Sequence, residues 1–143
     1  MVTKSETAPQ GMAQLRSPDS VEVTYARLKR VVAGRGLTIF AEIDFAHDAA
    51  AAGLSMRPAR LLIFGNPRAG TPLMVESPTL ALDLPLKILV WQAPDETTWV
   101  GYNTPEYLGA RHDVRDDLLQ NLQAVKILAE SAVGSDGAEA GAR

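Results

Sequence analysis

The most chemically distinctive stretch of the sequence is the loop Gly65–Thr71 (GNPRAGT), which separates an apolar run from a predicted helix. Asn66 is a preferred helix-capping residue, and Pro67 suits the first helical position. Backbone N–H groups at the start of a helix favour an anion, and Arg68 adds a positive charge. The loop therefore predicts an anion-binding site that includes Asn66, Arg68 and Thr71. The alternative is a tight strand-to-helix turn, because neither a Walker loop nor a GxGxxG fingerprint is present.

A second candidate site lies in the two apolar runs that flank the turn Ala93–Glu96. If these runs form a hairpin with a four-residue loop, Lys87 faces Tyr102 across the strand pair. A partly desolvated lysine has a lowered pKa and can bind an anion or act as a base. The alternative is a lysine at the sheet end that reaches water, with Tyr102 packed on its stem. The same hairpin places Trp91 and Trp99 on opposite faces.

A third candidate is the neighbouring pair Arg111 and His112. Arginine forms a fork for carboxylate or phosphate, and histidine titrates near neutral pH. The alternative for the histidine is solvent contact or a structural hydrogen bond. Glu42 and Asp44, two residues apart on one face of a strand, form a carboxylate pair that could do acid–base work. The alternative is that Asp44 caps the following helix and Glu42 is solvated. With only two histidines and no ligand spacing, we predict no metal site and no cofactor.

The elements that must position these residues follow from the spacing of apolar positions. Alternation predicts strands over 37–43, 60–64, 86–92 and 97–103, with a further one near 12–16. Helical spacing predicts helices over about 21–33, 44–53, 67–76 and 104–108, and one long helix from about 113 to 132. Because the hairpin at 86–103 requires an antiparallel pair, we expect an α+β fold. This is a two-layer domain with a mainly antiparallel sheet and helices packed on it.

Composition limits the classes of function that remain. The chain has 143 residues, which suits one domain over 11–133, with a flexible start at 1–10 and a disordered tail at 134–143. It contains no cysteine, which excludes disulfides, thiolate metal sites and cysteine nucleophiles. The net charge of −3 argues against a nucleic-acid-binding face. Since neither a targeting segment nor a membrane-length apolar run is visible, we expect a cytoplasmic protein that does not interact with a membrane.

Several separated motifs resemble the bacterial family named domain of unknown function 302, or DUF302. They are FAEID (40–44), LLIFGNPRAGTPLM (61–74), LDLPLKILVW (82–91), Tyr102-Asn103 with Pro105, and ARH (110–112). The resemblance implies a compact α+β fold and no established activity. It adds Asn103 to the candidate ligand-binding residues. One departure is that family members usually carry histidine directly after the aspartate of the first motif, where this chain has Phe45, and His47 follows two residues later.

Two classes of function remain after these observations. The first is a module that binds a small ligand or an anion through Asn66, Thr71, Lys87, Tyr102 and Arg111, if the fold brings them together. The second is a homodimeric structural or interaction domain, which the apolar C-terminal helix and the shortage of catalytic motifs favour. An enzyme that uses Lys87 with Asp44 or His112 is the weakest reading, because spacing identifies no nucleophile–base pair.

Overall fold

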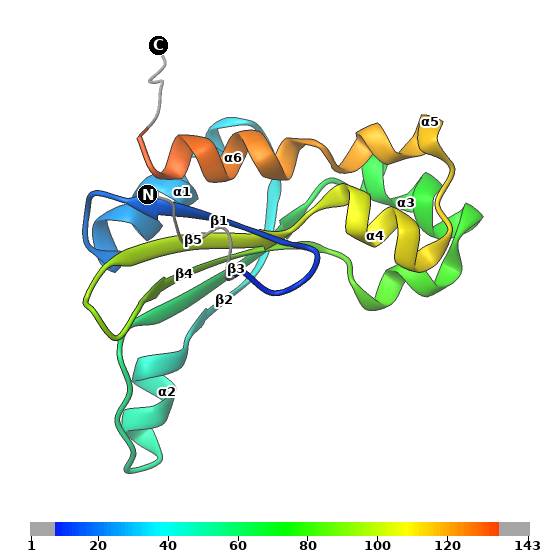
Figure 1. Ribbon diagram of the computed structural model, residues 1–143. Helices are drawn as coiled ribbons and strands as arrows, with labels where there is room; N and C mark the ends of the chain where they lie inside the picture. Colours follow the sequence, from blue (N-terminus) through cyan, green and yellow to red (C-terminus); the bar gives the residue numbers. More distant parts are fainter. Residues whose placement is uncertain (1–7, 135–143) are drawn as a thin grey trace.

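The computed structural model describes residues 8–134 and contains a five-stranded sheet (Figure 1). Its strands are β1 (Met12–Ser17), β2 (Thr38–Asp44), β3 (Ala59–Gly65), β4 (Leu86–Gln92) and β5 (Thr98–Asn103). They lie in the order β1-β5-β4-β3-β2, and every neighbouring pair is antiparallel. The predicted flexible start at 1–10 and the predicted disordered tail at 134–143 lie mainly outside the described residues.

Two helices, α1 (Val21–Gly34) and α6 (Ala124–Ala132), lie side by side on one face of the sheet (Figure 1). Alternate strand residues point toward them and form the main core with the apolar stripes of both helices. The buried strand residues of this core are Leu62, Phe64, Ile88, Val90, Val100 and Tyr102. The predicted α+β domain, with helices packed on a mainly antiparallel sheet, is confirmed.

The remaining helices sit at the ends of the sheet rather than on the main core (Figure 1). They are α2 (Phe45–Ala51), α3 (Pro67–Glu76), α4 (Pro105–His112) and α5 (Asp116–Leu119), with 3₁₀ helices η2 (Pro78–Leu82) and η3 (Gln120–Leu122). All of these except α2 surround a second, smaller apolar cluster of buried residues: Leu73, Leu80, Leu108, Val114 and Leu122. This cluster holds the end of the molecule that carries the candidate site.

The long helix predicted from about 113 to 132 is wrong, because the structure divides that segment into α5, η3 and α6. Its apolar stripe serves two different cores. Leu118 and Leu122 pack in the second cluster, whereas Val125 and Ala129 pack in the main core between the sheet and helices α1 and α6. The chain leaves α-helical geometry at η3, between the residues that pack in the two clusters.

The predicted pairing across the β4–β5 hairpin is wrong by one residue. The N–H of Ala93 donates to the carbonyl of Thr97, and the N–H of Glu96 donates to the carbonyl of Ala93, each at 2.8 Å. Three residues therefore form the loop, the last of them with a positive φ of 70°, as in common three-residue hairpins. Trp91 then lies directly opposite Trp99. A shift of one residue moves side chains to the other face, so the tryptophans share a face.

The positive φ of Glu96 gives a direct test of this loop. We expect Glu96→Gly to raise the free energy of unfolding by about 1 kcal/mol, because glycine adopts the left-handed region without the penalty of a side chain. The same change at Glu106, in the first turn of α4, should lower it. Urea denaturation measures both, and a destabilising Glu96→Gly would contradict the three-residue loop.

Candidate functional site

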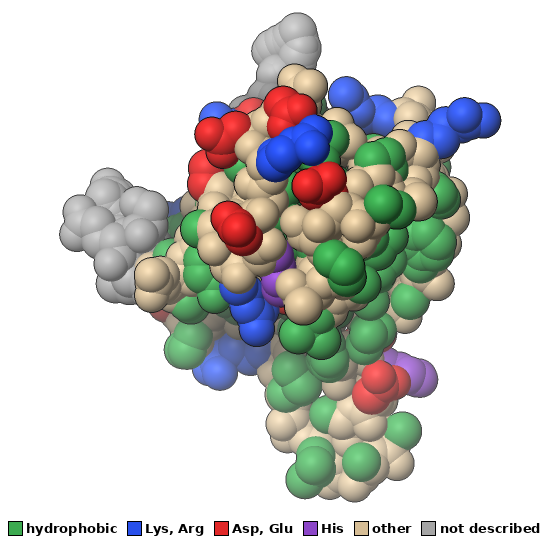
Figure 2. Space-filling model, turned by 90° about the vertical axis from the view of Figure 1, so that its right-hand side faces the viewer, with side chains coloured by type: hydrophobic (Ala, Val, Ile, Leu, Met, Phe, Trp, Pro, Cys, Tyr) green, Lys and Arg blue, Asp and Glu red, His purple; other side chains and the backbone are tan. Residues whose placement is uncertain are grey.

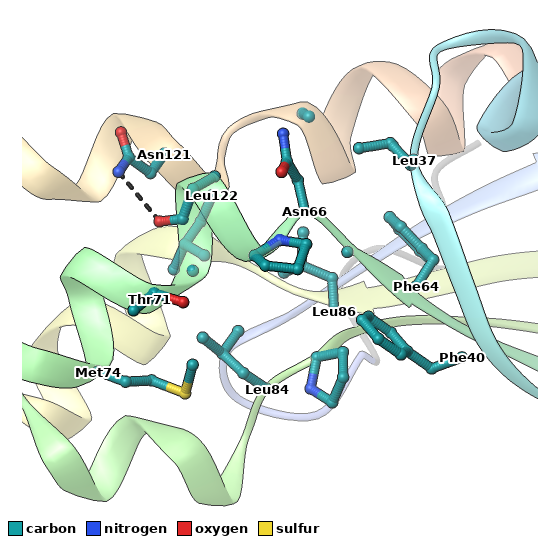
Figure 3. A pocket seen from close by; sticks show the side chains of 16 residues that line it. Leu37, Phe40, Phe64, Asn66, Thr71, Met74, Leu84, Leu86, Asn121 and Leu122 are labelled. Atoms are coloured by element: carbon teal, nitrogen blue, oxygen red, sulfur yellow. Dashed lines mark hydrogen bonds between the residues drawn. The ribbon is translucent and has the colours of Figure 1, made fainter.

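A pocket of about 280 Å³ lies where β3 passes into α3 (Figure 3). Its volume is close to the lower end of the roughly 300–1,000 Å³ range of small-molecule sites. Four segments build it: the end of β3 with α3, the stretch that leads into β4, the start of β2 with the residue before it, and the segment that leads into α6. Most of the lining is apolar, and it includes Leu37, Phe40, Phe64, Met74, Leu84, Pro85, Leu86 and Leu122.

The start of α3 forms part of the pocket and follows the local rules read from the sequence. Asn66 caps the helix by accepting the N–H of Arg68 on its side-chain oxygen at 3.0 Å, and Pro67 occupies the first position. The N–H groups of Ala69 and Gly70 donate to the Asn66 carbonyl, both at 2.9 Å. Pro67 has no N–H. The first-turn amides are therefore already used, and the helix start offers an anion little beyond its dipole.

Three polar side chains line this otherwise apolar pocket, namely Asn66, Thr71 and Asn121. Asn121 donates to the Ala69 carbonyl at 3.1 Å and so ties the segment before α6 to α3. The Thr71 hydroxyl points toward the pocket (Figure 3), and it has no hydrogen-bond partner that the described residues supply. A ligand with an apolar body and one polar group would match this lining.

Two predicted site residues lie elsewhere. The exposed Arg68 side chain does not line the pocket, although its backbone belongs to the α3 cap. Asp44 caps α2 by accepting the N–H of His47 at 3.0 Å, and its carboxylate lies 3.8 Å from Arg60. The capping interpretation of Asp44 is therefore the one that the structure bears out, and Phe45 begins the helix that it caps.

A second group of polar residues meets around the carboxylate of Asp83. Arg111 donates to it at 2.8 Å, and His112 Nε2 lies 2.5 Å from the same oxygen. His112 Nδ1 lies 2.9 Å from the hydroxyl of Thr79. Lys87 donates to the carbonyls of Asp83 and Pro85, at 3.2 and 3.1 Å. This Asp83 cluster fastens the end of α4 to η2 and to the start of β4.

For both Asp83 and Lys87, the neighbouring charges shift the pKa in the direction opposite to the shift that burial causes. Burial alone would raise the pKa of Asp83, but the hydrogen bond of His112 and the charges of Arg111, His112 and Lys87 lower it below its usual value. Burial lowers the pKa of Lys87, and the nearby charge of Asp83 offsets part of that effect. The side chain of His112 is only 5% exposed, so the cluster is a partly buried ionic contact.

Tyr102 and Asn103 join neither group. Tyr102 points into the main core, on the face of the sheet that α1 and α6 cover, and burial raises the pKa of its phenol. Asn103 is exposed at the end of β5 and pairs with Met12 of the edge strand. The predicted contact between Lys87 and Tyr102 is absent because the hairpin register differs by one residue.

The family model for the domain of unknown function DUF302 matches residues 13–130, which is most of the chain. The chain belongs to the DUF302 family. A crystal structure of an uncharacterised DUF302 protein from Bacillus stearothermophilus superposes with a TM-score of 0.71 at 17% sequence identity. The superposition covers 87% of this chain and 97% of that one, so the two share the DUF302 fold.

Curated relatives of this DUF302 chain are longer proteins. Fluoride-specific ion channel FluC 1 of Brucella suis is 36% identical over 104 residues, covering 73% of this chain and 41% of the relative. FluC 1 of Brucella abortus and FluC 2 of Brucella melitensis match at the same identity, with 38% of each covered. The chain thus spans about two fifths of the length of the curated relatives it matches. Within residues 8–134, no helix has the length and apolarity needed to cross a membrane.

Sequence reasoning did not select Asp83, Phe40 and Asn121, which the structure places in the Asp83 cluster and in the pocket lining. Asp83 lies in the LDLPLK segment that resembles DUF302, and it joins this segment to the ARH motif. Phe40 begins the FAEID motif but was not chosen as a site residue, and Asn121 lies in no motif; both reach the pocket through the packing of β2 and η3. In the part of the chain that the structure describes, acidic and histidine side chains form no cluster suited to a metal ion.

Proposed function

We propose that this DUF302 domain binds a small, largely apolar molecule in the pocket beside α3. The observation that carries the proposal is a cavity of about 280 Å³ with apolar walls and a few polar groups at its edge. Ligand sites in proteins have this composition, in which apolar walls supply affinity and placed polar groups supply orientation. The Thr71 hydroxyl and the Asn66 amide are the groups that would orient the ligand.

The structure favours an apolar ligand over an anion as occupant. The first-turn N–H groups of α3 are bonded to Asn66, and the Arg68 side chain lies outside the lining. The other cations considered, Lys87 and Arg111, are occupied in the Asp83 cluster. A fully charged ligand would therefore lose its hydration in the pocket without gaining an ionic partner.

A thermal-shift experiment with matched neutral and charged probes tests this proposal. We expect octanol and small neutral aromatics to stabilise the domain at least as well as octanoate, and inorganic phosphate to have no effect. A ligand at about one hundred times its dissociation constant adds about 2.7 kcal/mol to the free energy of unfolding, which raises Tm by several degrees. Stabilisation by phosphate or octanoate alone would refute the apolar site.

A larger side chain that fills the pocket from α3 should weaken the binding of neutral probes. A Cβ added at Gly70 would meet Leu84 and Met74 at ordinary contact distances of 3.9 and 4.0 Å. We therefore expect Gly70→Leu to fold, to place its side chain in the pocket, and to weaken probe binding by about tenfold or more, equivalent to about 1.4 kcal/mol. Isothermal titration with the best neutral probe measures the change.

Gly34→Leu is the matched control, because Gly34 ends α1, does not line the pocket, and a Cβ added there meets nothing within 4 Å. It should bind the probe as the parent chain does. Both substitutions replace a helical glycine, which improves helix propensity, so loss of binding in Gly70→Leu cannot arise from a less stable helix. Equal binding by both variants would show that the probe does not bind in this pocket.

A further inference from the structure

The face of the sheet that looks away from α1 and α6 is unusually apolar. Alternation along the strands places seven large apolar side chains on it: Met12, Ile43, Leu61, Ile63, Leu89, Trp91 and Trp99. Polar side chains on this face lie along the edge strand β1 (Gln14 and Arg16) and at strand ends, such as Lys87 and Asn103, and Trp99 is already only 8% exposed in the single chain. Gly101 lies on the same face, and a Cβ added there would meet the side chains of Met12 and Trp91. An antiparallel sheet with one face in water normally shows polar residues there. The composition of this face is that of a covered surface.

An apolar arm extends from the same side of the sheet. Helix α2 and the loop that follows it project away from the body, opposite α1 and α6, and form the lowest part of the molecule in both views (Figures 1 and 2). None of the seven residues of α2 is buried. Phe45, Leu54 and Met56 are 37%, 69% and 49% exposed. A helix this short has little stability of its own in water, so the arm lacks the packing that would hold it.

We infer that a second copy of this chain covers the apolar sheet face, with the arm of each copy lying against the sheet of the other. Each chain carries both an apolar face and an apolar arm, on the same side. A two-fold rotation therefore satisfies both surfaces of both chains with one repeated contact, which is how symmetric dimers are built.

The area of the face agrees with this arrangement. Five strands about 4.8 Å apart, each of six or seven residues that rise about 3.4 Å, present roughly 500 Å². A stable interface buries about 800 Å² on each partner. The face alone is smaller than such an interface, so the inferred dimer requires the exposed apolar side chains of the arm to contribute the rest.

The predicted dimerisation through the C-terminal helix has lost its support, because α6 is packed in its own core. Val125, Leu128, Ala129 and Ala132 of that helix are all buried against α1 and the sheet. The surface inferred here is a different one, and it does not depend on the ligand pocket. Gly70→Leu should therefore leave association unchanged even where it abolishes probe binding.

Sedimentation combined with intrinsic fluorescence tests the dimer in the full chain. Both tryptophans of the protein lie on the inferred interface, but Trp99 is only 8% exposed in the single chain, so a change of emission on dissociation reports mainly on Trp91. We expect a dimer at high concentration, and a shift of emission to longer wavelength as dilution releases monomers. A chain that is monomeric throughout, or a dissociation that leaves the emission unchanged, overturns the inference and assigns the face to another partner.

Charged substitutions separate this surface from other exposed apolar residues. We expect Leu89→Lys on the face and Met56→Glu on the arm each to give monomers. Val75→Glu is the control, since Val75 is 76% exposed on α3, away from this face, and it should remain dimeric. Met56 lies in an exposed loop, so its variant keeps the fold. A dimer that survives both Leu89→Lys and Met56→Glu would refute the interface.

Discussion

Phe64→Ala is expected to lower the free energy of unfolding by about 3–5 kcal/mol. Phe64 is fully buried on β3, where it belongs to the main core and also forms one wall of the pocket. Removing the ring loses its transfer free energy and leaves a cavity that the surrounding strands cannot close. Because domains of this kind have only about 5–15 kcal/mol of stability in total, the variant loses a large share. Guanidinium denaturation at neutral pH measures it.

The same substitution carries a second expectation that links stability to the site. The lost ring enlarges the pocket, so a larger neutral aromatic probe should stabilise Phe64→Ala more than it stabilises the parent chain. Leu61→Ala is the comparison, because Leu61 lies on the same strand but faces away from the core and is only partly buried; we expect a smaller loss and no change in probe preference. A loss at Phe64 no greater than at Leu61 would show that Phe64 is not a core residue.

Replacing Asp83 by alanine is expected to cost about 1.5–3 kcal/mol, the range for hydrogen bonds to charged groups. The carboxylate accepts from Arg111 and His112, and its side chain is only 16% exposed. Without it, Arg111 loses its partner and the buried His112 ring keeps only the contact with Thr79. The connection between α4 and the start of β4 is then weakened.

Asp117→Ala is the matched control for Asp83→Ala. Asp117 also pairs with an arginine, Arg115, but both side chains are more than half exposed, and exposed ion pairs contribute little. Urea denaturation of the two variants should therefore show a clear loss at Asp83 and almost none at Asp117. Equal effects would mean that the Asp83 cluster is no more than a surface ion pair.

The dependence of this effect on pH has a defined sign. Folding lowers the pKa of Asp83, so the folded state favours the charged carboxylate. The stabilisation is fully present above the ordinary carboxyl pKa of about 4, and it is lost as pH falls through the lower value of the folded chain. The difference in stability between the parent chain and Asp83→Ala should be retained at about pH 5 and above and should shrink in acid.

Local features of this chain could be read directly from its residues. Asn66 followed by Pro67 marks the start of α3, and Asp44 marks the start of α2, because a capping side chain needs only backbone groups two or three positions away. The strands follow from alternating side chains, and the DUF302 motifs identify the family that the match over residues 13–130 confirms. These inferences hold because they depend on contacts within a few residues.

The hairpin between β4 and β5 shows that local sequence alone does not determine the register of two paired strands. Three or four loop residues between β4 and β5 both suit the turn composition, and the choice depends on Glu96 adopting a positive φ and on how the sheet packs. That single residue moved Tyr102 into the core, away from Lys87, and placed both tryptophans on the uncovered face. A period of two along a strand turns each such shift into a change of side for every residue.

The sequence by itself determined the fold class, the helix starts, the family and the absence of cysteine chemistry. Only the tertiary structure decided which polar residues meet: Asn66 and Thr71 at an apolar pocket, and Lys87, Arg111 and His112 around Asp83. It also divided the C-terminal helix between two cores and left one face of the sheet apolar and uncovered by α1 and α6. The physical reason is range, since capping and alternation act between near neighbours, whereas sites and interfaces arise where distant segments pack.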